Sequence, residues 1–144
     1  MSDTAAHAGR PLKVLHVDDD PMNLRVVQEI LGAFGHAAVS TCSGAEALRR
    51  LAEDDFDLML LDIHMPGMTG LEVIERLRAA PGAERDIPVI ALTADIYSRR
   101  PQEYLALGFT DFVSKPILVS GLMAAIRKAV GVTPEAETLK RAAG

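Results

Sequence analysis

Apolar residues recur along the chain with two alternating spacings. Short, nearly continuous apolar runs separate longer segments in which apolar residues recur every three or four positions. The short runs are typical of strands buried on both faces, and the longer spacing is typical of amphipathic helices. The expected strands are Leu12–Val17, Ala38–Thr41, Asp57–Asp62, Ile87–Thr93 and Thr110–Val113.

A helix is expected after each strand. These helices are Met22–Phe34, Gly44–Glu53, a segment from Thr69 to about Ala79, a weaker one over about Arg100–Leu107, and one over about Val119–Val130. Residues that favour helix ends agree with these bounds, because Ser43 and Thr69 can cap helix starts and Gly35 and Gly108 can end helices. Because Pro101 is tolerated only at the first helical position, the fourth helix should start close to it.

Five strand–helix units predict an α/β protein with a doubly wound parallel sheet that helices cover on both faces. We expect one domain over residues 12–130. Residues 1–11 are expected to be a disordered tail, and residues 131–144 a tail, a linker or a short helix. An extended loop over residues 97–100 is expected to leave the fourth helix loosely anchored. In such sheets a site forms at the carboxyl ends of the strands, beside the point where the strand order reverses.

Polar residues at these strand ends form a chemically compatible set. They are Asp18, Asp19 and Asp20 after the first strand, Asp62 at the end of the third, Thr93 at the end of the fourth, and Lys115 after the fifth. Clustered carboxylates repel one another unless a cation balances them, and a few oxygen ligands suit Mg²⁺. The lysine can balance charge, the hydroxyl can donate to an anionic oxygen, and one carboxylate could attack phosphorus. Asp20, which precedes a proline, fits a helix N-cap equally well.

Four motifs at the strand ends give a resemblance to a known family. VLHVDDDPMN, DLMLLDIHMPGMTG, VIALTAD and FVSKPI occur in this order. Together they closely resemble the response-regulator receiver domain of two-component signalling, from about Leu12 to Val130. The resemblance implies a chemotaxis-regulator-like fold with the flavodoxin-like strand order 2-1-3-4-5. It also implies that the domain takes a phosphoryl group from the phosphohistidine of a histidine kinase or a histidine phosphotransfer protein.

The resemblance implies roles for the residues that match the motifs. Asp62 matches the phosphoacceptor. The implied Mg²⁺ ligands are Asp18, Asp19, Asp62 and the backbone carbonyl of His64. Thr93 and Lys115 match the residues that contact the phosphoryl group, and the peptide bond between Lys115 and Pro116 is expected to be cis.

Phe112 matches the aromatic position that switches with phosphorylation. The resemblance implies that Thr93 moves toward the phosphoryl group and that the Phe112 ring fills the vacated space. The surface of the fourth helix, fifth strand and fifth helix would then change, and a downstream protein would read the change. Many relatives carry tyrosine where this chain has Phe112, so its switching would rest on apolar burial. A plain core role for this ring is the alternative.

Composition narrows the choice of function. The chain has 144 residues, a formal net charge of −5 and one cysteine. The acidic balance argues against direct nucleic-acid binding, and one cysteine permits no internal disulfide. The chain has no apolar run of membrane-spanning length and its start does not resemble a signal peptide, so we expect a cytoplasmic protein that binds no membrane. We expect His16, within the first strand, to be a core histidine whose hydrogen bonds are satisfied.

Two other functions fit the sequence less well than a receiver domain does. A Mg²⁺-dependent phosphohydrolase with an aspartyl-phosphate intermediate commonly has a second acid two residues after its nucleophile, but this chain has His64 there. A nucleotide or flavin binder would need a glycine-rich loop after the first strand, where this chain has aspartates. We therefore expect no enzyme, beyond catalysis of its own phosphorylation and dephosphorylation. The pattern leaves open a stand-alone regulator or a receiver from a hybrid kinase, and the pairing of two copies as a weak homodimer.

Overall fold

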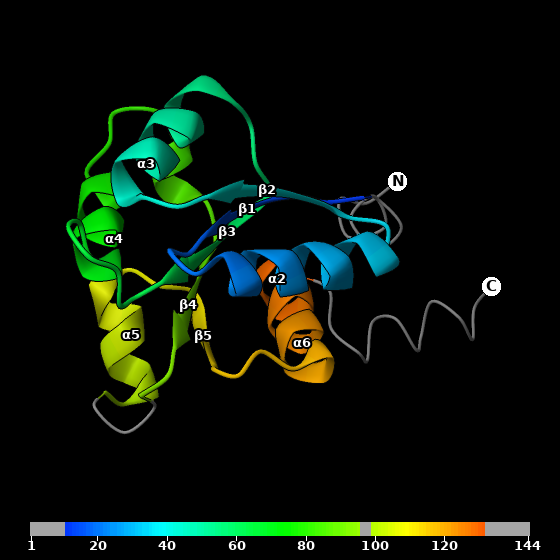
Figure 1. Ribbon diagram of the computed structural model, residues 1–144. Helices are drawn as coiled ribbons and strands as arrows, with labels where there is room; N and C mark the ends of the chain where they lie inside the picture. The colour runs from blue at the N-terminus through cyan, green and yellow to red at the C-terminus, as the bar shows by residue number, and fades with distance from the viewer. Residues whose placement is uncertain (1–10, 96–98, 132–144) are drawn as a thin grey trace.

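The computed structural model describes residues 11–95 and 99–131 (Figure 1). Its strands are β1 (Lys13–Val17), β2 (Ala37–Thr41), β3 (Leu58–Asp62), β4 (Val89–Thr93) and β5 (Asp111–Ser114). Its helices are α2 (Pro21–Ala33), α3 (Gly44–Glu53), α4 (Gly70–Arg78), α5 (Pro101–Leu107) and α6 (Val119–Ala129), with a 3₁₀ turn, η1 (Ala83–Asp86), before β4. The expected N-terminal tail, most of the loop around residue 97 and the C-terminal segment lie outside the described residues.

The five strands form one parallel sheet in the order β2-β1-β3-β4-β5, which confirms the predicted fold. Strand β1 pairs with β2 on one side and with β3 on the other. The chain therefore reverses its direction across the sheet beside β1. This is the place where a doubly wound sheet forms its binding crevice.

Two apolar cores lie on opposite faces of the sheet. Helices α2 and α6 cover one face, and α3, α4 and α5 cover the other (Figure 1). Strand β3 is buried along its whole length and contributes alternate side chains to both cores, which is why its sequence is continuously apolar. Among the residues that the structure describes, no helix has the length and apolar character needed to cross a membrane.

Side-chain caps begin three of the helices, all close to the carboxyl edge of the sheet. The Asp20, Ser43 and Thr69 side chains accept backbone N–H groups of α2, α3 and α4 respectively. Asp20 is thus the N-cap of α2, and Pro21 occupies the first turn of that helix. Each cap fixes where a helix leaves the sheet edge and so shapes the loops around the site.

All five expected strands differ from the structure by one or two residues at an end, and the differences at β4 and β5 show the causes most clearly. The strand expected at residues 87–93 begins at Val89, because Ile87 ends η1 and Pro88 has no N–H to donate. The strand expected at residues 110–113 runs one residue later, over Asp111–Ser114. Thr110 still bonds to the sheet, since its N–H donates to the Val89 carbonyl at 2.7 Å.

Candidate functional site

Three carboxylates meet at the carboxyl edge of the sheet. Asp18 follows β1 and Asp62 ends β3, and these strands are neighbours, so the two side chains converge. Carboxylate oxygens of Asp18, Asp19 and Asp62 all lie within 4.8 Å of one another. Asp18 and Asp62 are buried, whereas Asp19 is exposed. The cluster opens into a cleft of about 500 Å³ lined by Asp18, Asp19, Asp20, Pro21, Asn23, Asp62, His64, Ala94 and Lys115.

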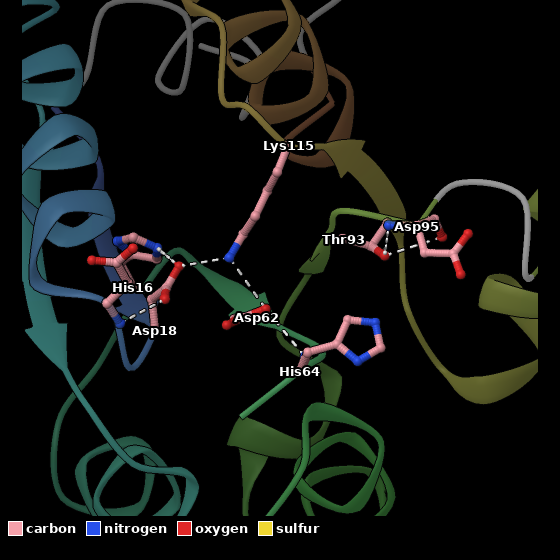
Figure 2. Close-up of polar contacts among 8 residues, drawn as sticks. His16, Asp18, Asp62, His64, Thr93, Asp95 and Lys115 are labelled. Atoms are coloured by element: carbon pink, nitrogen blue, oxygen red, sulfur yellow. Dashed lines mark hydrogen bonds and ion pairs between the residues drawn. The ribbon is translucent and has the colours of Figure 1, made fainter. Parts of the chain in front are cut away.

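Lys115 reaches into this cluster from the loop after β5 and bridges two of the carboxylates (Figure 2). Its Nζ lies 3.1 Å from Asp18 Oδ2 and 3.3 Å from Asp62 Oδ1. The backbone positions the lysine, because its N–H donates to the Thr93 carbonyl at 2.8 Å. The peptide bond between Lys115 and Pro116 is cis. One ammonium group is therefore shared by carboxylates from two adjacent strands.

The proximity of these charges changes their proton affinities. Burial raises the pKa of Asp62, the Lys115 ammonium opposes that rise, and the nearby Asp18 carboxylate adds to it. For Lys115, burial alone lowers the pKa, but its contacts with Asp18 and Asp62 outweigh burial and raise it above the usual value. Lys115 is therefore charged at neutral pH and acts as the resident counter-ion of the cluster.

The backbone on both sides of the cleft holds the carboxylates in place. The His64 N–H donates to Asp62 Oδ1 at 3.1 Å, and the Asp20 N–H donates to Asp18 Oδ1 at 3.0 Å. Behind Asp62, the first residue of α4 packs against the strand end, since the Gly70 N–H donates to the Ile63 carbonyl at 3.0 Å. Main-chain N–H groups, which cannot rotate away, therefore fix one oxygen of Asp18 and one oxygen of Asp62.

Neither Thr93 nor Phe112 is among the described residues that line the cleft. Thr93 is buried, and its hydroxyl accepts the Asp95 N–H at 3.1 Å and lies 3.2 Å from the Asp95 carbonyl (Figure 2). Phe112 is half-buried and stacks on Tyr104 with ring centroids 5.0 Å apart. Sequence reasoning did not identify Tyr104, although its place in a short helix four residues before Gly108 could have marked it as inward-facing.

One buried residue differs from its expected environment. His16 is fully buried, but neither ring nitrogen has a hydrogen-bond partner within the described ranges, so the expectation of a satisfied core histidine is wrong. Burial lowers the pKa of His16 to about 4, although the Asp18 carboxylate opposes that change. The apolar spacing of β1 predicts that His16 points inward. It does not predict that α2 and α6 supply no polar partner on that face.

The donor set fits a small, hard divalent cation. All three clustered side chains line the cleft and offer carboxylate oxygens, and one of them, Asp19, is exposed. Mg²⁺ binds through a few carboxylates and keeps several water ligands, which suits a site with two buried acids and an open side. Soft-metal ligands are missing from the cleft, because its described lining contains no cysteine.

Comparison with known proteins agrees with this arrangement. The family model described as the response regulator receiver domain matches residues 14–127. The chain therefore belongs to the response regulator receiver domain family, whose members are signalling modules of phosphotransfer systems. Solved structures share the fold, and two of them are described here. One is the chemotaxis protein CheY4 of Vibrio cholerae, with a TM-score of 0.76, 28% identity and coverage of 83% of this chain and 99% of that chain.

The other is the receiver domain of sensor histidine kinase PA1611 from Pseudomonas aeruginosa PAO1, solved with a magnesium ion coordinated in its active site cleft. Its TM-score is 0.76 at 26% identity, and the match covers 85% of this chain and 99% of that chain.

Sensor proteins are among the similar curated relatives. The chain is 38% identical over 117 residues to the aerobic respiration control sensor protein ArcB of Escherichia coli (strain K12), and 35% identical over 127 residues to the sensor protein GacS of Pseudomonas syringae pv. syringae. These matches cover 81% and 87% of this chain but only 15% and 14% of those relatives. The likeness is therefore to one part of much longer proteins.

Proposed function

We propose that Asp62 accepts a phosphoryl group from the phosphohistidine of a histidine kinase or a histidine phosphotransfer protein. One observation carries the proposal: the buried Asp62 carboxylate lies in a three-carboxylate cluster, with the Lys115 ammonium 3.3 Å from its Oδ1. A buried carboxylate beside a cation and open to a cleft is suited to attack at phosphorus. The kinship with sensor proteins and the magnesium-bound receiver support this chemistry.

The metal in this proposal is Mg²⁺, held by the carboxylates of Asp18, Asp19 and Asp62 and by the backbone carbonyl of His64. When bound, Mg²⁺ supplies positive charge that offsets the charge on the transferred phosphoryl oxygens. The backbone N–H groups of Asp20 and His64 donate to Asp18 and Asp62 and keep these two buried carboxylates in fixed orientations.

The contacts that Asp62 already makes indicate which of its two oxygens attacks phosphorus. Oδ1 accepts the His64 N–H and faces Lys115, so we assign the attack to Oδ2. A bond forms between Oδ2 and phosphorus while the bond between phosphorus and the donor imidazole nitrogen breaks, and the imidazole keeps the electron pair. Lys115, which is cationic before the reaction, contacts a phosphoryl oxygen of the resulting acyl phosphate.

The new charge on Asp62 would bias a two-state equilibrium in the surface around α5, β5 and α6. Thr93 would exchange its local contacts with Asp95 for a phosphoryl oxygen, and Phe112 would follow it inward. Large apolar side chains are exposed in α5, namely Leu105 and Leu107, and at the start of α6, namely Leu118 and Val119. They offer a downstream protein, or a second copy of the chain in a weak homodimer, an apolar area that the switch can alter.

The chemistry is confined to the domain itself in this proposal. The position two residues after Asp62 holds His64 rather than an acid, so we expect autophosphorylation and autodephosphorylation but no turnover of general phosphomonoesters. A cytoplasmic location stays a prediction.

The test is the intact mass of the protein after incubation with Mg²⁺ and phosphoramidate, a small donor with the phosphorus–nitrogen bond found in phosphohistidine. We expect one phosphate adduct that requires Mg²⁺, that is lost in Asp62→Asn and that is absent when a chelator is present. Asp20→Asn is the matched control: it removes a neighbouring carboxylate while asparagine keeps the helix cap.

The outcomes separate the proposal from its rivals. An unchanged adduct in Asp62→Asn would contradict the assigned phosphoacceptor. Loss of the adduct in Asp20→Asn as well would show that the charge of the whole loop matters, rather than the three-carboxylate cluster. Steady release of phosphate from p-nitrophenyl phosphate would instead favour a phosphohydrolase.

A further inference from the structure

His16 lies beside the carboxylate cluster with its hydrogen-bonding capacity unused. It sits in β1 between Ser40 of β2 and Leu60 of β3, on the face that α2 and α6 cover. Its side chain is fully buried, and no group in the described part of the chain bonds to either ring nitrogen. A buried imidazole without a partner costs free energy, and an apolar side chain would avoid that cost at this position.

The polar group that His16 faces is the carboxylate of Asp18. His16 Nε2 lies 3.8 Å from Asp18 Oδ2, too far for a hydrogen bond (Figure 2). In this structure the same oxygen already has a donor, because Lys115 Nζ lies 3.1 Å from it. The imidazole ring of His16 carries an N–H that can donate to a carboxylate oxygen.

The ammonium group of Lys115 cannot contact every anionic oxygen that the proposed reaction creates. It already divides its contacts between Asp18 Oδ2 and Asp62 Oδ1. A phosphoryl group on Asp62 would present further anionic oxygens on the cleft side and draw the ammonium toward them. Asp18 Oδ2 would then lose its donor inside a buried site, and the His16 ring is the neighbouring buried group with an N–H to offer.

Resting on the proposed function, we propose that His16 is a positioning residue for phosphorylation: its Nε2–H takes over Asp18 Oδ2 when Lys115 turns to the phosphoryl group. The distance of 3.8 Å between Nε2 and Oδ2 would have to shorten by about 0.8 Å to reach an ordinary hydrogen-bond length of about 3.0 Å. The new bond would hold the carboxylate of Asp18, one of the proposed metal ligands, in a single orientation. Partners of this kind orient metal-binding carboxylates and strengthen metal affinity.

A beryllofluoride titration in the presence of Mg²⁺ tests this exchange, because beryllofluoride mimics a phosphoryl group. His16→Leu removes the donor, His16→Gln keeps a donor at the end of a longer side chain, and Val14→Ala perturbs the same face of β1 without touching a polar group. We expect the apparent affinity for beryllofluoride to fall about tenfold in His16→Leu, and to stay within about twofold of wild type in His16→Gln and Val14→Ala.

Affinity for Mg²⁺ alone, measured by calorimetry, separates this role from a structural one. Without a phosphoryl mimic Lys115 still serves Asp18, so we expect His16→Leu to bind Mg²⁺ about as well as wild type. A similar loss for Mg²⁺ alone and for beryllofluoride would mean that His16 merely shapes the resting site, and it would overturn the exchange.

A measurement on the wild-type protein avoids dependence on how the variants fold. Nitrogen-15 labelled histidine side chains give NMR signals for the four imidazoles of the chain, and the His16 signals are those missing from His16→Gln. We expect the Nε2–H proton signal of His16 to shift downfield when beryllofluoride is added. An unchanged His16 signal in protein saturated with beryllofluoride overturns the His16 proposal alone. Failure of wild type to bind beryllofluoride with Mg²⁺ overturns the proposed function and this exchange together.

Discussion

Gly70 begins α4 directly behind the end of β3, which carries Asp62, and Gly70→Ala should damage that strand end. A Cβ atom at this position would lie 2.5 Å from the Asp62 carbonyl oxygen and 2.7 Å from the Ile63 Cα. Both contacts are with backbone, so no side-chain rotation can relieve them. The end of β3 or the start of α4 must shift, and the Asp62 carboxylate shifts with it.

The size of the effect follows from two opposing terms. Alanine normally stabilises a helix relative to glycine by about 0.5–1 kcal/mol. Overpacking that forces backbone movement costs about 1–3 kcal/mol. Gly70→Ala should therefore lower the free energy of unfolding by about 1–2 kcal/mol. Gly121→Ala in α6 is the matched control, because no atom lies within 4 Å of a Cβ there, and it should raise the free energy of unfolding by about 0.5–1 kcal/mol.

Urea unfolding of wild type and the two variants measures both effects under one protocol. The extent of Mg²⁺-dependent phosphorylation, measured by intact mass, should fall in Gly70→Ala and stay unchanged in Gly121→Ala. Equal stability of the two variants would refute the argument that the Asp62 backbone leaves no room at Gly70. Normal phosphorylation in a destabilised Gly70→Ala would show that the carboxylate does not follow the backbone.

Two further predictions concern buried polar groups. Because the pKa of His16 is about 4 when folded and near 6.5 when unfolded, the unfolded chain binds the proton more readily and stability falls as the pH drops through this window. Urea unfolding at pH 7 and pH 5 should show wild type losing about 2 kcal/mol more than His16→Gln, and equal losses would contradict the assigned burial effect. The Tyr104 hydroxyl is buried without a partner in the described residues, so Tyr104→Phe should match wild type or gain up to about 1 kcal/mol in urea unfolding. A loss above about 1 kcal/mol in Tyr104→Phe would mean that the hydroxyl does have a stabilising partner.

The sequence predicts which residues lie at the carboxyl edge of the sheet better than it predicts the contacts of their side chains. Continuous apolar runs such as Asp57–Asp62 locate the central strands, and polar residues directly after them must lie at the carboxyl edge of a parallel sheet. The direction of a hydroxyl is not contained in that pattern. Thr93 has the expected place, yet its hydroxyl bonds to Asp95, because a local turn offers a donor and an acceptor within two residues.

The ends of secondary-structure elements and the surroundings of isolated polar residues are harder to predict from the sequence. The start of β4 depends on η1 and on Pro88, neither of which alters the apolar run that predicted the strand. The environment of His16 depends on side chains brought from α2 and α6, far away in sequence. Both errors concern tertiary contacts, which periodicity within one segment does not report.

The ammonium shared between Asp18 and Asp62 has a consequence for electroneutrality. Three carboxylates and one lysine leave two unbalanced negative charges in the cluster, which is the charge that one divalent cation neutralises. With Mg²⁺ bound, as in the proposed function, the cluster would therefore have no net charge before a phosphoryl group arrives. A phosphoryl group then adds negative charge to a site that is already neutral, and every cation of the cluster is already balanced by a carboxylate. The groups that can respond to the added charge are then neutral hydrogen-bond donors, namely the Thr93 hydroxyl on one side and the His16 imidazole on the other.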